Sequence, residues 1–408
     1  MDKLRANKVF ILCCLALTVT SMTFAIRAGI LGELGAQYGL SANQLGWVNA
    51  MAFLGFPLAT MFGGILYNAM GAKKLITLAF VCHLLGLILT ISSGGFWGLL
   101  ISTFLIGFAN GSVEAGCNPL IAEIYEDNKT TMLNKFHVWF PGGIVIGALI
   151  SNVMTSAGLG WQLQVATIIV PTLIYGYMLL SSEFPEFDRS QHSTVDNIKH
   201  LFTPLYIFLV ACMTLTATTE LGTQQWIQGI LGASGASPMI ILALMTGIMA
   251  VGRYYAGPIV HRLNPAGVLL FSAIFASIGM LMMSMVSGGM IYLAAIIFAV
   301  GVCYFWPTML GCVSEYLPKT GALGLSIIGG AGMFAVSMWN PVIGTWIDDA
   351  TASAEAQNLD PTQVQILAGQ EVLQNLLLFP VILIVAFAVL FFIVKRITGQ
   401  RIATATQN

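Results

Sequence analysis

The stretch from Asn110 to Gly143 reads N-G-S-V-E-A-G-C-N-P-L-I-A-E-I-Y-E-D-N-K-T-T-M-L-N-K-F-H-V-W-F-P-G-G, and its first part continues an apolar segment that begins near Phe96. Glu114 therefore lies inside a predicted membrane-spanning helix. An ionisable side chain there costs roughly 2.5–3.5 kcal/mol and normally faces a wet cavity or a partner. Asn110, Glu114 and Asn118 follow at i, i+4 and i+8, on one helical face. The pattern predicts a polar site within the membrane, although a carboxyl bonded to a neighbouring helix for packing alone would look the same.

The composition is that of an integral membrane protein. Of the 408 residues, 57% are hydrophobic and 8% are charged, against roughly 25% charged residues in soluble domains. The formal net charge of -1 argues against nucleic acid as a partner. The seven cysteines fall in apolar segments without a C-x-x-C pair, and none of the five histidines stands at metal-ligand spacing. We therefore expect no disulfide framework, no metal and no cofactor.

Twelve segments approach the length of about 20 apolar residues that a membrane span needs. They cover residues 9–31, 45–68, 74–93, 97–122, 135–157, 161–181, 204–230, 237–260, 267–287, 290–315, 321–346 and 373–396. Apart from Arg27, the Lys and Arg residues lie in the termini or on one side of the predicted membrane. The positive-inside rule then predicts a multi-pass protein of the cell (inner) membrane with both termini cytoplasmic.

The longest polar cytoplasmic stretch divides the spans six and six. We expect an N-terminal six-helix half at residues 1–181, a cytoplasmic linker at 182–203 and a C-terminal six-helix half at 204–408. Spans 2 and 8 also close on similar sequences, G-G-I-L-Y-N-A-M-G-A-K-K from Gly63 and A-G-P-I-V-H-R-L-N from Ala256. Such repeated halves are typical of secondary transporters, which bind their substrate near the midplane between the halves.

On these features the chain resembles the major facilitator superfamily over essentially its whole length. The loop from Gly64 to Lys74 is similar to that family's motif between helices 2 and 3, with Gly71 and Lys73 in place. The resemblance implies an all-α fold of twelve transmembrane helices and a gating role for Gly71 and Lys73. Asn68 departs from the motif, because the family often has Asp there, and this places a charge-based latch at the loop in doubt.

Within the superfamily, the chain most resembles the fucose/glucose-galactose permease-like sugar symporters. Three features carry this resemblance: Glu114 ahead of Asn118-Pro119, the stretch E-L-G-T-Q-Q-W from Glu220 to Trp226, and the Gly252-Arg253 end of helix 8. The resemblance implies transport of a sugar together with a proton.

Arg27 is the one basic residue away from the predicted cytoplasmic side. Its planar fork suits a carboxylate or phosphate, so it could bind an anionic substrate. Alternatively, it could pair with a carboxylate of the protein. Depth along the helices, at about 1.5 Å per residue, favours Glu220 over Glu114 as that partner. We therefore expect an Arg27–Glu220 contact between the two halves.

Helix 7 carries a polar stripe with Thr216, Glu220, Gln224 and Gln228 at i, i+4, i+8 and i+12. Amides and a carboxyl on one face suit a solute with several hydroxyls, although a helix that only lines a watery passage would look alike. The predicted substrate-binding residues are Arg27, Asn110, Glu114, Asn118, Glu220, Gln224, Trp226, Trp306 and Asn340. The tryptophans could equally be packing aromatics, and we expect His137 to be an interhelical hydrogen-bond donor rather than a proton relay.

Arg253 lies near the cytoplasmic end of helix 8, where we expect a structural or gating role. Glu114 and Glu220 are the predicted proton-coupling groups, because burial disfavours the charged form of a carboxyl. We expect a monomeric secondary transporter, most simply a proton-coupled sugar symporter, with sodium coupling left open. The alternatives are an organic-anion or drug-type carrier that uses Arg27 and, more remotely, a membrane enzyme acting on lipid. We do not expect an enzyme, because the chain lacks a nucleophile–base set or metal cluster at membrane depth.

Overall fold

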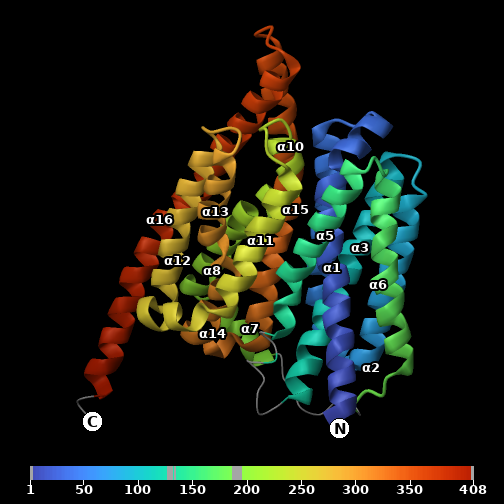
Figure 1. Ribbon diagram of the computed structural model, residues 1–408. Helices are drawn as coiled ribbons and strands as arrows, with labels where there is room; N and C mark the ends of the chain where they lie inside the picture. The colour runs from blue at the N-terminus through green and yellow to red at the C-terminus, as the bar shows by residue number, and fades with distance from the viewer. Residues whose placement is uncertain (1–2, 126–131, 133–134, 186–194, 406–408) are drawn as a thin grey trace.

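The computed structural model describes residues 3–125, 132, 135–185 and 195–405, and the regular structure of that part of the chain is helical (Figure 1). Eleven of the described helices are long and apolar enough to cross a membrane, and a shorter apolar helix at Pro238–Tyr254 makes up the predicted twelve. The eleven are Leu4–Tyr38, Ala42–Gly63, Met70–Ile91, Phe96–Asn118, Lys135–Ser156, Trp161–Ser181, Pro204–Gln225, Arg262–Met283, Met290–Val313, Ser326–Glu355 and Pro361–Val394. The predicted all-α, twelve-span architecture is confirmed.

We call the first six spans the N-terminal group. They are built from α1 (Lys3–Tyr38), α2 (Ala42–Ile91), α3 (Phe96–Ile124), α5 (Trp139–Ser156) and α6 (Trp161–Ser181). Both chain ends lie at the lower end of the bundle in Figure 1. We call this end the terminal face and the opposite end the far face.

The last six spans form the C-terminal group, in which helix 7 is assembled from four short pieces. Those pieces are α8 (Pro204–Ala217), the π-helical turn η2 (Thr218–Gly222), α9 (Thr223–Gln225) and α10 (Ile227–Leu231). The remaining spans are α11 (Pro238–Tyr254), α12 (Ala256–Met283), α13 (Met290–Val302) with α14 (Phe305–Tyr316), α15 (Gly321–Glu355) and α16 (Pro361–Ala405). The short α7 (Val195–Leu201) and η3 (Pro318–Thr320) pack together outside the spans.

The two similar closing sequences share an unusual backbone conformation. Gly71, where α2 turns from its second to its third span, has φ 79° and ψ 166°, and Asn264 in α12 has φ 55° and ψ 164°. Each lies seven residues after the glycine of its own closing sequence, Gly64 or Gly257. This region of backbone space is nearly restricted to glycine. Asn264 is stabilised there because its Oδ1 accepts a hydrogen bond from the Gly267 amide at 2.9 Å. An N-cap residue makes the same kind of bond at the start of a helix. The shared geometry supports the internal repeat.

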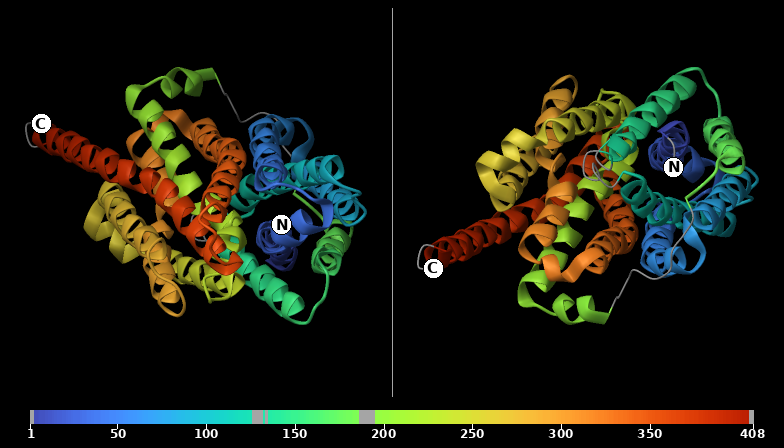
Figure 2. Two further views of the ribbon diagram at one scale, coloured as in Figure 1. Left: turned by 90° about the horizontal axis from the view of Figure 1, so that it is seen from above. Right: turned by 90° about the horizontal axis from the view of Figure 1, so that it is seen from below.

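The two groups lie side by side, as the views along the bundle show (Figure 2). They are joined mainly by α2 against α15 and by α5 against α11. Near the far face, the Asp348 carboxylate accepts hydrogen bonds from the amides of Ala42 (3.0 Å) and Asn43 (2.9 Å) at the start of α2. A carboxylate at a helix N-terminus is favourably placed against the helix dipole. A Cβ on Gly46 would lie 2.5 Å from the Asn340 carbonyl oxygen, so α2 and α15 are in close backbone contact on this side.

At the terminal face, Lys73, one of the predicted gating residues, lies beside the start of the predicted linker. The Lys73 ammonium donates to the Ser182 carbonyl at 3.3 Å and lies 5.5 Å from the centre of the Phe184 ring. Gly71 supplies the positive φ described above. The predicted boundary at residues 182–203 stays a prediction, because residues 186–194 of that linker lie outside the described part of the chain.

Candidate substrate and proton site

Arg27, in the middle of the bundle on α1, is 7% exposed and is held by two neutral amides. Its Nε donates to the Asn49 Oδ1 at 3.0 Å and to the Gln225 Oε1 at 3.1 Å, and its Nη2 donates to the same Gln225 oxygen at 2.7 Å. The Gln225 amide nitrogen in turn donates to the Phe24 carbonyl at 3.3 Å. Gln225 of α9 therefore links the C-terminal group to α1 of the N-terminal group.

The predicted Arg27–Glu220 pair is wrong. Glu220 pairs with Arg253, with its Oε1 3.3 Å from the Arg253 Nη2. The prediction treated helix 7 as a regular α-helix. Glu220 lies in the π-helical turn η2, and such a turn contains an extra residue, which rotates every later side chain to a different face. Because of this rotation Gln225, rather than Glu220 or Gln224, reaches Arg27.

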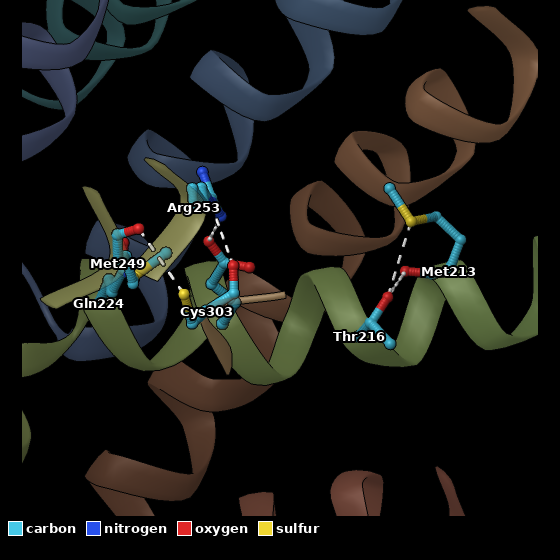
Figure 3. Close-up of polar contacts among 7 residues, drawn as sticks. Met213, Thr216, Gln224, Met249, Arg253 and Cys303 are labelled. Carbon is cyan, nitrogen blue, oxygen red and sulfur yellow. Dashed lines mark hydrogen bonds and ion pairs between the residues drawn. The ribbon is translucent and has the colours of Figure 1, made fainter. Parts of the chain in front are cut away.

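The same π-helical turn divides the predicted polar stripe of helix 7. Figure 3 shows Met213 and Thr216 well apart along the helix from Gln224, which lies with Met249 and Arg253. The Gln224 amide is 3.6 Å from the Met249 sulfur. Beyond it the Trp226 indole donates to the Asn340 side-chain oxygen at 3.0 Å, and both residues are buried. The side-chain hydrogen-bond partners of Gln224, Trp226 and Asn340 therefore lie within the C-terminal group.

Arg253 binds a carboxylate and a backbone carbonyl of the C-terminal group. Pro307 cannot donate a backbone hydrogen bond to the carbonyl of Cys303, four residues earlier, which leaves that carbonyl free. The Arg253 Nε donates to this carbonyl at 2.9 Å while Nη2 meets Glu220. Arg253 thus ties α11 to η2 and to the break between α13 and α14, in line with a structural role.

Glu114 and Asn118 form a second polar cluster with His137 of the fifth span. The Asn118 amide donates to the Glu114 Oε2 at 2.7 Å, and the His137 Nε2 lies 3.1 Å from the Asn118 Oδ1 and 4.0 Å from the same Glu114 oxygen. The side chains of Glu114 and His137 are 14% and 45% exposed. The i, i+4 spacing in the sequence correctly placed Glu114 and Asn118 together, and the contact of His137 with Asn118 agrees with the interhelical hydrogen bond expected for His137.

Asn110, the third predicted residue of that helical face, belongs to a separate buried chain inside the N-terminal group. Its Nδ2 donates to the Thr23 hydroxyl at 3.1 Å, and its Oδ1 lies 2.7 Å from the His83 Nε2. The His83 Nδ1 lies 2.8 Å from the Tyr175 hydroxyl. This chain crosses four spans. Sequence reasoning missed His83 and Tyr175, and the available signal was two polar residues within apolar spans.

Aromatic side chains from both groups cluster next to Arg27. Phe24, Phe53 and Phe56 form a cluster with Leu221 and Val336, and Phe140 and Trp306 pack against it. The Arg27 guanidinium carbon lies 5.1 Å from the centre of the Phe24 ring and 5.6 Å from that of Phe53, within the range of cation–π attraction. Trp306, one of the predicted substrate-binding residues, packs against this aromatic cluster.

Within the part of the chain that the structure describes, no group of three or more His, Cys, Asp or Glu residues is placed to hold a metal ion. Three polar groups are therefore candidates for a functional site: Arg27 with its two amides, the Arg253–Glu220 pair, and Glu114 with Asn118 and His137.

This arrangement agrees with the comparison with known proteins. The family model described as "Major Facilitator Superfamily" matches residues 12–340. The chain belongs to the major facilitator superfamily. Among solved structures, it is similar to a D-xylose-proton symporter, with a TM-score of 0.74 and 15% identity over 91% of this chain and 97% of that one. It is also similar to a bacterial homologue of the human lysosomal transporter Spinster in an inward-facing, unoccupied conformation, with a TM-score of 0.77 and 14% identity over 97% and 98% of the two chains.

Curated relatives match over shorter stretches. A probable nitrate/nitrite antiporter of Thermus thermophilus is 30% identical over 190 residues, which cover 45% of this chain and 43% of the relative. A D-xylose transporter of Levilactobacillus brevis is 29% identical over 181 residues, or 43% and 39% of the two chains. The matched stretches thus span less than half of these relatives' own lengths. The chain is a multi-pass membrane protein of this superfamily.

Proposed function

We propose that the protein is a secondary transporter that couples a proton to the movement of a sugar or similar polyhydroxy solute by alternating access. In this proposal the two groups are rigid halves that rock around a site between Arg27 and the aromatic cluster. Sugar transporters among the relatives, such as the D-xylose transporter, support the solute class. The positive-inside rule supports a cytoplasmic terminal face in the cell membrane, and we propose that the unit is a monomer.

The observation that carries the proposal is the environment of Glu114. Its carboxylate accepts a hydrogen bond from the neutral Asn118 amide, and His137 is its one ion-pair partner among the described residues. No Lys or Arg among the described residues forms an ion pair with Glu114. Glu114 can therefore exchange a proton without leaving a permanent cation unpaired. Glu220 differs, because the permanently charged Arg253 holds it, and we place the coupling proton on Glu114.

The test measures uptake of a radiolabelled sugar into proteoliposomes, with and without an inward proton gradient. It compares the wild type with Glu114→Gln and Glu371→Gln. Glu371 is an exposed carboxyl on α16 and serves as the matched control. We expect Glu114→Gln to abolish gradient-driven accumulation and to retain exchange of solute across the membrane, and Glu371→Gln to behave as the wild type. Gradient-driven accumulation by Glu114→Gln at the wild-type level would contradict the proposal.

Arg27 favours a second candidate, a carrier of anions. Among the described residues no carboxylate lies at ion-pair distance from Arg27, so its charge is available to a ligand. The relative described as a probable nitrate/nitrite antiporter is consistent with an anionic solute. Uptake of a small carboxylate that depends on Arg27, without uptake of any polyhydroxy solute, would favour this candidate over the first.

A further inference from the structure

Arg27 is a buried cation with no counter-charge among the residues that the structure describes. Among the described residues, Arg27 is buried and Arg253 is partly buried within the spans, and Arg253 is paired with Glu220 at 3.3 Å. Arg27 contacts only amide oxygens and aromatic rings within the described part of the chain. A buried charge is normally paired or bound to a ligand, because removal from water disfavours an isolated ion. The arrangement around Arg27 is therefore incomplete without an anion.

One unused hydrogen-bond donor belongs to a residue that contacts Arg27, and an unused hydroxyl lies further along the same helix. The Asn49 side chain is fully buried, and its Oδ1 faces Arg27 while its Nδ2 has no partner among the described residues. The Thr20 hydroxyl, two helical turns before Arg27 on α1, is buried and likewise unpaired. Buried donors in native proteins are almost always satisfied by protein, water or ligand. The unpaired Asn49 amide nitrogen and the Arg27 guanidinium lie next to each other, and both are donors that suit an oxygen-rich acceptor.

Gln225 shows how such an acceptor would sit. Its Oε1 accepts from both Nε (3.1 Å) and Nη2 (2.7 Å) of Arg27, which is the edge of the guanidinium that a carboxylate engages with two parallel hydrogen bonds. A carboxylate binds a guanidinium more strongly than a neutral amide does. A ligand carboxylate would therefore displace Gln225, and with it one of the bonds between the two groups.

We propose that the transported solute is a sugar acid, a polyhydroxy monocarboxylate whose carboxylate binds Arg27 and the Asn49 amide. This inference rests on the proposed function and specifies its substrate class. A monoanion fits because Arg27 supplies one positive charge and Arg253 is already neutralised. The freed Gln225 amide offers hydrogen bonds to hydroxyl groups. The rings of Phe53 and Trp306 offer surfaces for the carbon skeleton.

A neighbouring cavity does not suit the same ligand. It lies inside the N-terminal group, where Thr23, Arg27, Thr90 and Thr103 are its polar lining residues and the remainder is aliphatic. Such a lining offers few partners for the hydroxyls of a sugar acid. We therefore place the ligand on the side of Arg27 that faces Gln225, between the two groups.

The test measures equilibrium binding of D-glucuronate, D-glucose and acetate to the purified full-length protein in detergent by titration calorimetry. The variants are Arg27→Gln, Arg27→Lys and Asn49→Leu, and the control is Arg262→Gln, which removes an exposed arginine. We expect glucuronate to bind at least tenfold more tightly than glucose or acetate. Arg27→Gln should weaken glucuronate binding at least 100-fold and Arg27→Lys by a smaller factor, with Arg262→Gln unchanged. Size-exclusion chromatography identifies variants that fail to fold, and Asn49→Leu then tests the same site.

The outcomes separate this inference from the proposed function. Equal binding of glucose and glucuronate, unaffected by Arg27→Gln, overturns the sugar-acid assignment, and gradient-driven glucose uptake would then leave the symporter proposal standing. Acetate binding as tight as glucuronate overturns the polyhydroxy part and supports the anion carrier. Glucuronate binding that depends on Arg27, without gradient-driven uptake, supports this site and contradicts proton coupling. Binding of none of the three overturns the assignment.

Discussion

Two arginines, the buried Arg27 and the partly buried Arg253, lie within the spans of this protein, and they differ in what they touch. Arg253 donates to a carboxylate, Glu220, and to the carbonyl that Pro307 leaves free at Cys303. Arg27 donates to two amide oxygens, those of Asn49 and Gln225. The first site is electrically complete within the C-terminal group. The second bridges the two groups and keeps an unbalanced positive charge at the place where they meet.

A structural charge and a ligand-binding charge therefore differ in whether the protein itself supplies the opposite charge. A neutralised pair holds helices together, and removing one member leaves the other charge exposed to an apolar surrounding. A cation with only dipolar partners can exchange them for an anion at a low energetic cost. The three predictions below change one site toward the character of the other, or remove one of its parts.

The largest expected effect is on the Arg253 site. Glu220→Gln leaves Arg253 as a buried cation without its carboxylate, which should lower the free energy of unfolding by about 3 kcal/mol. The double variant Glu220→Gln/Arg253→Gln should recover most of the loss, whereas Arg27→Gln alone should cost less than about 1 kcal/mol because its partners are neutral. Chemical unfolding in detergent, followed by tryptophan fluorescence, gives these values. An equal loss for Glu220→Gln and Arg27→Gln would remove the distinction between the two sites.

The second prediction gives Arg27 the partner that it lacks. Gln225→Glu places a carboxylate where the amide oxygen now accepts from Nε and Nη2. The internal carboxylate should compete with a ligand carboxylate and weaken glucuronate binding about 30-fold, or about 2 kcal/mol. Gln228→Glu, on the same helix but partly exposed, is the control and should bind as the wild type. Unchanged affinity in Gln225→Glu would show that the ligand does not use this edge of Arg27.

The smallest effect is expected at Asn49. Asn49→Ala removes the unpaired amide nitrogen together with one acceptor of Arg27. Ligand binding should weaken about tenfold, which is about 1.4 kcal/mol and typical of one hydrogen bond to a charged group. The free energy of unfolding should change little, because a buried amide without a partner is itself costly. A large loss of stability without a loss of affinity would identify Asn49 as a packing residue.

The sequence was sufficient for the fold. Apolar span length and the positions of Lys and Arg predicted twelve helices, and the similar sequences that close spans 2 and 8 predicted a repeat that Gly71 and Asn264 now show in their backbone angles. These features are local and periodic, and a single chain displays them directly. The pairing of Glu114 with Asn118 was predictable for the same reason, since i, i+4 neighbours meet on any regular helix.

The partners of the arginines could not be predicted in the same way. Depth along helix 7 was estimated from α-helical geometry, and the π-helical turn at Thr218–Gly222 shifts the face of every later residue. No residue type marks such a turn in the sequence. Contacts between distant spans, such as Arg27 with Gln225 or His83 with Asn110, depend on how helices rotate against one another, which spacing within one helix does not encode.

The charge that moves with the solute gives the most direct test of the roles proposed for Arg27 and Glu114. If Arg27 binds a monocarboxylate and Glu114 carries one proton, each cycle moves no net charge. Glucuronate uptake into proteoliposomes should then follow the pH gradient and stay the same when a potassium gradient with valinomycin sets the membrane potential. Uptake of neutral glucose that increases with an inside-negative potential, with no uptake of glucuronate, would contradict the role proposed for Arg27.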